Sequence, residues 1–227
     1  MGKIKDTLHY ETVTPILANV LSFLMNDEAF NPFRLVGGTN LSLRFGHRQS
    51  DDIDLFTDSD YGSIDFSSLE KILSVKFPFF DSPDRSGLIG FGRMYYVGLN
   101  RDNAVKLDLM YTDKFLSEPE TIDGIRFASI DQIAAMKLSA ISLGGRKKDW
   151  WDVHKLLEEY SLEQMFRLYE KWQPWTYDQA KLMEALVDFS KADLQPDPKC
   201  LEGKDWDIIK IDIINQVRLL EAAKSVI

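Results

Sequence analysis

Hydrophobic and polar positions follow two different spacings along the chain. Up to about residue 128, short alternating or apolar runs predict strands, which are Phe33 to Val36, Asp52 to Phe56, Tyr95 to Leu99 and Ala104 to Tyr111. Helical spacing predicts helices at His9 to Met25 and Ser67 to Phe77, with a loop at Pro78 to Gly87. From Ser129 onward the spacing is helical. We therefore expect an α+β fold: a small mixed sheet with flanking helices in residues 1–128, then a helical C-terminal domain in residues 129–227.

A glycine pair, Gly37 and Gly38, follows the first predicted strand. Glycine lets the backbone turn and come close to a ligand, and a phosphate could lie there. Thr39 is expected to cap a short helix that runs to Phe45 and ends at Gly46, so that amide N–H groups face the ligand. The sequence therefore predicts a phosphate-binding turn.

Two aspartates lie on one face of the next predicted strand. Alternation points Asp52 and Asp54 to one side, and Ile53 and Leu55 to the buried side. Like charges this close raise each other's pKa unless a cation lies between them. Magnesium prefers oxygen ligands and is commonly held by carboxylates together with substrate phosphates. A turn followed by an acidic strand end is the purely structural alternative.

A third aspartate belongs to a predicted hairpin whose strands are joined by four polar residues, Asn100 to Asn103. In the second strand, alternation places Lys106 and Asp108 on one face and three aliphatic side chains on the other. An exposed strand aspartate without a function would show the same pattern. Another turn, Asp123-Gly124, predicts a smaller hairpin before the helical part begins.

A lysine interrupts an apolar stripe in the first helix of the C-terminal part. That helix is predicted to open at Ser129 and to stop at Gly144-Gly145, and Lys137 shares its stripe with aliphatic residues. The next helix presents Asp149 and Asp152 on one face. Because a buried lysine needs an anionic partner, a bound triphosphate is one interpretation. A lysine that reaches solvent beside a solvated charged face is the other.

The segment Phe33 to Phe56 resembles the nucleotidyltransferase superfamily that includes DNA polymerase β, through Gly-Gly-Thr, a short helix and an Asp-x-Asp strand. Its longer form, GGT followed by R-x-S-D-D-I-D-L-F, is similar to the AbiEii/AbiGii toxin branch. The matching residues after the glycines are Arg48, Ser50, Asp51, Asp52 and Asp54. The run K-L-S-A-I-S-L-G-G-R-K-K-D-W-W-D, which begins at Lys137, resembles a second block of that branch.

The resemblance implies a role for each matching residue. Catalysis and the binding of two Mg²⁺ ions with a nucleoside triphosphate would fall to Asp52, Asp54 and Asp108. Asp108 would also act as the general base. Nucleotide binding would fall to Gly37, Gly38, Thr39, Arg48, Ser50, Lys137 and Arg146, with Asp149 and Asp152 in support. The C-terminal domain would complete the active site.

Composition limits the classes of function. A net charge of −9 argues against a protein that coats nucleic acid non-specifically. A few phosphates could still bind at the cations Arg85, Arg93, Arg101, Lys106 and Arg146 to Lys148. The single Cys200 rules out an intrachain disulfide and fits a reducing cytosol. Since no apolar run suits export or a membrane span, we expect a cytoplasmic protein without a membrane partner.

Together these features predict a magnesium-dependent nucleotidyltransferase that moves a nucleoside monophosphate from a nucleoside triphosphate to an acceptor hydroxyl. The resemblance implies the toxin of a toxin–antitoxin or phage-defence pair, whose antitoxin need not bind it directly. An RNA end is the favoured acceptor, and a protein hydroxyl is the second. A non-catalytic nucleotide-binding regulatory module is the alternative, and a scaffold protein is the third possibility.

Overall fold

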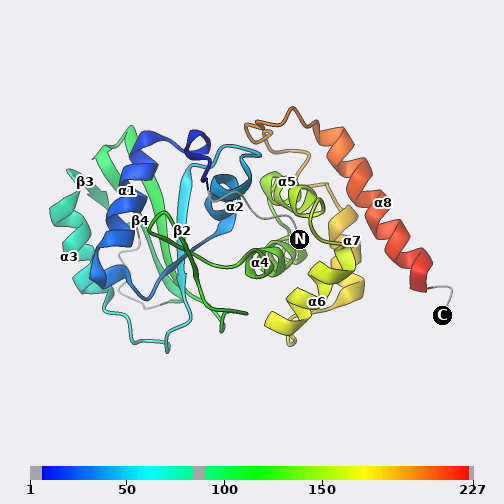
Figure 1. Cartoon of the computed structure of the whole chain (residues 1–227), viewed down its shortest axis with the longest axis horizontal. Coiled ribbons are helices and arrows are strands. Elements are labelled where there is room, and N and C mark those ends of the chain that lie inside the picture. Colours follow the sequence, from blue (N-terminus) through cyan, green and yellow to red (C-terminus); the bar gives the residue numbers. More distant parts are fainter. Residues whose placement is uncertain (1–6, 84–89, 225–227) are drawn as a thin grey trace. The chain divides into compact units, whose positions relative to one another are not determined.

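The structure is a computed structural model that describes residues 7–83 and 90–224, so that Arg85 and part of the loop predicted at Pro78 to Gly87 lie outside it. The chain divides into two compact units, Met1–Ser129 and Ile130–Ile227. The first unit contains a mixed sheet, and the described part of the second is helical. The predicted α+β fold class is confirmed (Figure 1).

Seven strands form one sheet among the described residues, in the order β3-β4-β5-β2-β1-β7-β6. Their bounds are β1 Arg34–Val36, β2 Asp52–Thr57, β3 Phe79–Asp81, β4 Gly92–Asn100, β5 Asn103–Tyr111, β6 Glu120–Ile122 and β7 Ile125–Phe127. The pairs β2–β5 and β1–β7 are parallel, and the other neighbours are antiparallel. The hairpin predicted around Asn100 to Asn103 is present, but only two residues separate β4 from β5.

Helices of the first unit pack on the sheet through apolar side chains. They are η1 Tyr10–Thr12, α1 Pro15–Asn26, η2 Glu28–Phe30, α2 Gly37–Phe45 and α3 Phe66–Lys76. Buried residues of α1 and α3 share one core with alternate residues of the strands, and Figure 1 shows both helices beside the sheet. The helix predicted from His9 begins only at Pro15, because the Thr14 side chain accepts a hydrogen bond from the N–H of Leu17 and caps it there.

The second unit contains five α-helices within the described residues. They are α4 Ile130–Ser142, α5 Lys147–Leu156, α6 Leu162–Trp172, α7 Gln179–Val187 and α8 Trp206–Lys224. Helix α4 packs against α5, α6 and α7, and α8 packs against the same three helices. In the part of the chain that the structure describes, no helix combines the length and the apolar character needed to cross a membrane.

Candidate active site

The turn after β1 lies so close to neighbouring side chains that it requires glycine. Gly37 has a φ of +70°, in the left-handed region that favours glycine, and a Cβ there would overlap the Asp54 carboxylate. A Cβ on Gly38 would overlap the guanidinium of Arg48. The glycine pair therefore brings the backbone directly against an acidic side chain of β2 and a buried arginine.

Thr39 does not cap the helix as predicted. Helix α2 begins at Gly37, and the Thr39 hydroxyl instead donates to the carbonyl of Asp52 and lies 2.9 Å from Ser50 Oγ. Arg48 is 1% exposed and donates from Nη1 to the Gln49 carbonyl at 2.9 Å. Thr39, Arg48 and Ser50 are all buried, and the contacts of Thr39 connect the turn to Ser50 and to the start of β2. Their contact with a nucleotide stays a prediction. The predicted end of the helix at Gly46 is confirmed.

The three candidate carboxylates lie on one face of two neighbouring strands. In the parallel pair of β2 and β5, Asp54 lies opposite Asp108, and Asp52 lies opposite Lys106. Residues in register point to the same face of a sheet, while the alternate residues Ile53 and Leu107 are fully buried in the core. The predicted alternation of both strands is confirmed, and it brings the carboxylates together from segments far apart in sequence.

Asp108 has two differently placed oxygens. Its Oδ2 is paired with the ammonium of Lys106, two residues earlier on the same strand, whereas its Oδ1 is buried without a hydrogen-bond partner. The described residues hold no cluster of three His, Cys, Asp or Glu side chains that could bind a metal ion as it stands. Carboxylate oxygens and an orphaned acceptor nonetheless suit a hard cation. The donor set therefore fits Mg²⁺, provided that Lys106 gives up its contact.

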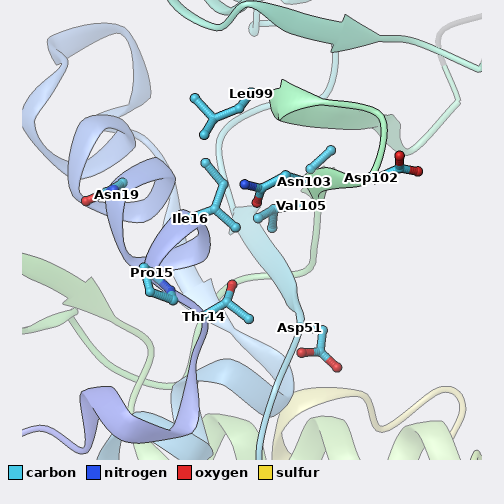
Figure 2. Close-up of a pocket in the computed structure, with 10 residues that line it drawn as sticks. Thr14, Pro15, Ile16, Asn19, Asp51, Leu99, Asp102, Asn103 and Val105 are labelled. Atoms are coloured by element: carbon cyan, nitrogen blue, oxygen red, sulfur yellow. The ribbon is translucent and has the colours of Figure 1, made fainter.

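A cavity of about 370 Å³ lies between the start of α1 and the β4–β5 hairpin, as Figure 2 shows. Ile16, Leu99 and Val105 supply apolar parts of its lining, and Asp51 and Asp102 supply carboxylates. Val105 belongs to the alternate residues of β5 that face the core, whereas Asp108 belongs to the other set. This cavity is therefore separate from the face that carries the three candidate carboxylates.

The second unit contains a buried charge cluster. The Lys137 ammonium on α4 lies 2.8 Å from Asp149 Oδ1 and 2.6 Å from Asp152 Oδ2, both on α5. The side chains are 7%, 6% and 0% exposed. Thus the buried position predicted for Lys137 is confirmed. Two carboxylates already surround its ammonium, and contact of Lys137 with a bound triphosphate stays a prediction.

The start of α5 is tied to the same cluster. The backbone N–H of Arg146 donates to Asp149 Oδ2 at 2.8 Å, while the Arg146 residue itself is exposed. Burial alone would raise the pKa of Asp149, but the charge and hydrogen bond of Lys137 and the Arg146 N–H outweigh it and hold this pKa below its ordinary value. Asp149 and Asp152 therefore form a buried network with Lys137, and Asp149 also binds the amino terminus of α5, while their predicted support of a bound nucleotide stays a prediction.

Sequence reasoning missed one residue that supports the turn. Asn40, the residue after Thr39, is fully buried, and its Nδ2 donates to the carbonyls of Leu35 at 2.7 Å and Ala128 at 3.0 Å. It thereby ties β1 to the chain just after β7. The only signal in the sequence is a polar pair, Thr39-Asn40, directly after the glycine pair.

Comparisons with known proteins agree with this arrangement. A family model described as the nucleotidyl transferase AbiEii toxin of type IV toxin–antitoxin systems matches residues 20–223. An uncharacterized protein of Aquifex aeolicus (strain VF5) is 31% identical over 170 residues, which cover 71% of this chain and 76% of that protein.

Two solved structures share the fold. JHP933 from Helicobacter pylori has a TM-score of 0.58 at 21% identity, and the match covers 93% of this chain and 94% of that one. MenT4, a nucleotidyltransferase toxin of Mycobacterium tuberculosis H37Rv, has a TM-score of 0.54 at 14% identity, with 83% and 76% covered. Since the family model extends from within α1 to within α8, this chain belongs to the AbiEii family of nucleotidyltransferase toxins of type IV toxin–antitoxin systems.

Proposed function

We propose that the protein transfers a nucleoside monophosphate from a nucleoside triphosphate to an acceptor hydroxyl, with Mg²⁺, and releases pyrophosphate. The observation that carries this proposal is the register of Asp54 opposite Asp108 across two parallel strands, directly beside the close turn at Gly37. Acidic side chains on rigid strands next to a close backbone turn suit a triphosphate and its metal ions.

Asp52, Asp54 and Asp108 would hold the metal, which when bound neutralises phosphate charge in the reaction. The turn at Gly37 and Gly38 brings the backbone directly against Asp54 and Arg48, so phosphates held by the metal ions would lie close to this turn. Asp108 would accept the proton of the acceptor hydroxyl, whose oxygen then forms the new bond to the α-phosphorus as the bond to pyrophosphate breaks. Arg146 is exposed and is available to a phosphate.

The first experiment asks whether these carboxylates act in transfer. Asp54→Asn and Asp108→Asn should each lose about 100-fold or more of the transfer of α-phosphate label, because a metal ligand or the base is removed. Asp60→Asn changes an exposed aspartate beyond the end of β2 and serves as the matched control. Transfer at the parental rate in Asp108→Asn would contradict the assigned base.

We further propose an RNA end as the acceptor. Of the cations considered for phosphates, Arg93 is buried 3.9 Å from Glu70, and Lys147 is buried 2.9 Å from Asp197, whereas Arg101 and Arg146 are exposed. Because only a few of these cations are exposed, we expect the protein to contact a few phosphates at the end of an RNA chain. Rates measured below saturation should then fall with salt at a log–log slope of roughly −0.7 for each phosphate contacted.

The acceptor is tested by incubating the protein with each labelled nucleoside triphosphate, total RNA and total cell protein. We expect label that RNase releases and protease does not. Label confined to protein would move the acceptor to a protein hydroxyl. Nucleotide binding without any transfer would favour a regulatory module. The family implies a cognate antitoxin, and we propose that this antitoxin need not contact the toxin directly.

A further inference from the structure

A lysine stands among the carboxylates of the proposed metal site. Lys106 lies opposite Asp52 in the register of β2 and β5, and its ammonium contacts Asp108 Oδ2. Both side chains project from the interior of a strand that is paired on both sides, with β2 and with β4. The ion pair is therefore held by rigid backbone, and it is partly shielded, since the Lys106 and Asp108 side chains are 29% and 16% exposed.

This arrangement places a cation of the protein beside three carboxylates that share one face. Carboxylates a few ångströms apart repel each other, and a cation beside them lowers that repulsion. The Lys106 ammonium is a cation of the protein itself that lies in contact with one of these carboxylates, Asp108. A divalent ion that uses Oδ2 of Asp108 must displace Lys106, and an ion on either oxygen must tolerate the positive charge of the lysine.

We propose that Lys106 is a positioning residue that makes metal binding depend on nucleotide. Without nucleotide, Lys106 holds Asp108 and keeps a divalent ion from using all three carboxylates. A triphosphate offers the ammonium a new anionic partner, and Asp108 is then released to the metal ion and the acceptor. This inference rests on the proposed function of the same face, and it adds an order of binding: nucleotide and metal together, rather than metal first.

The test measures Mn²⁺ binding by the electron paramagnetic resonance signal of the free ion, with full-length protein and no nucleotide. Lys106→Met keeps the length of the side chain and removes its charge, so we expect Mn²⁺ to bind at least about tenfold more tightly. Lys106→Arg should bind as weakly as the parent. The matched control, Lys71→Met, removes a charge from an exposed position on α3 and should leave binding unchanged.

Two further variants show which carboxylate the lysine controls. The gain should vanish in the double variant Lys106→Met with Asp108→Asn. In the single variant Asp108→Asn, nucleotide-free binding should stay at the parental level, because Lys106 already withholds that carboxylate. A loss of Mn²⁺ affinity in Asp108→Asn would overturn the proposal. This test does not depend on any substitution of Lys106.

The outcomes separate this inference from the proposed function. Unchanged Mn²⁺ affinity in Lys106→Met, with nucleotide binding weakened, would make Lys106 a simple phosphate contact and would overturn the proposal. A protein that gains Mn²⁺ affinity as expected but transfers no label from any nucleoside triphosphate would retain the role of Lys106 and lose the proposed reaction. A folding defect lowers affinity and cannot imitate the expected gain.

Discussion

At the scale of single residues, Gly37 has two separate reasons to be glycine. Its φ of +70° disfavours other residues, and the space where a Cβ would stand is filled by Asp54. Gly124, in the turn between β6 and β7, has a similar φ of +76° but open space around it. Substitutions at these two positions would therefore separate the effect of backbone strain from the effect of crowding against Asp54.

Gly37→Ala should displace Asp54 and lower transfer by about 100-fold or more, since a misplaced metal ligand removes the assembled site. Gly124→Ala should lose roughly 1 kcal/mol of unfolding free energy from strain and keep full transfer. Label transfer and denaturant unfolding of both variants check this. Equal activity in the two variants would mean that Asp54 tolerates the added methyl group.

At the scale of elements, α4 and α5 are joined by a buried lysine between two aspartates. A second lysine of this unit, Lys210 on α8, also lies between two aspartates, 3.2 Å from Asp193 and 3.0 Å from Asp207, but its side chain is 23% exposed. Buried and exposed ion pairs differ greatly in what their loss costs, because a buried charge left alone has neither water nor a partner.

Lys137→Met should therefore lower the unfolding free energy by about 3 kcal/mol or more, as it leaves Asp149 and Asp152 buried without a cation. Lys210→Met should cost less than about 1 kcal/mol. Urea unfolding at neutral pH measures both. Adding Asp149→Asn and Asp152→Asn to Lys137→Met should restore part of the loss, and a further loss instead would show that charge is not the cause.

The same cluster should make stability depend on acidity. The pKa of Asp149 is lowered from 3.8, so its contribution is full above that value and is lost as pH falls through the lower pKa of the folded protein. The unfolding free energy should thus decline below about pH 4, and Asp149→Asn should decline less steeply. Urea midpoints across this range provide the measurement, and parallel curves for parent and variant would contradict it.

Most of these helices and strands could be predicted from the sequence, because long helices and alternating strands have a clear hydrophobic period. The predicted helix at Ser67 to Phe77 differs from α3 by one residue at each end. Strand β3 was missed because it has three residues at the sheet edge, within a stretch expected to be a loop. The start of α2 at Gly37 was missed because glycine normally disfavours helix.

The candidate site, too, could be predicted from the sequence only in part. Alternation correctly predicted the shared faces of Asp52, Asp54 and Asp108, because a strand has one simple period. The partners of Lys137 and the contact of Lys106 with Asp108 could not be foreseen, since several charged side chains were available to each lysine. Spacing along a chain predicts a face, whereas the choice of partner depends on tertiary packing.

At the scale of the whole molecule, the first unit encloses its own core. One cluster of buried apolar residues runs from Leu17 to Phe127 and includes residues of α1, α3 and the strands. Asn40 and the N–H of Ala128, which donates to Leu35 at 3.0 Å, fasten the last residues of the unit to β1. Thus the segment before the boundary belongs to the sheet by direct hydrogen bonds.

We expect a fragment of residues 1–129 to unfold in one cooperative transition, because its core is large enough for a domain and is complete within it. Replacing Asn40 with Ala in that fragment should cost about 1–3 kcal/mol, since buried carbonyl groups lose their donor. Circular dichroism melts measure both. A broad, non-cooperative melt of the parent fragment would show that the helical unit is needed for folding.

The pairing of β5 with β2 also determines when the protein can become harmful during its synthesis. Residues up to β2 supply the glycine turn and two of the carboxylates, but the third comes from β5, after α3, β3 and β4. Parallel pairing of β2 with β5 requires this intervening chain to be closed into a loop first. A ribosome that stops before residue 103 therefore releases a product without Asp108. On the proposed mechanism, a toxin whose translation stops before β5 is harmless to the cell that makes it.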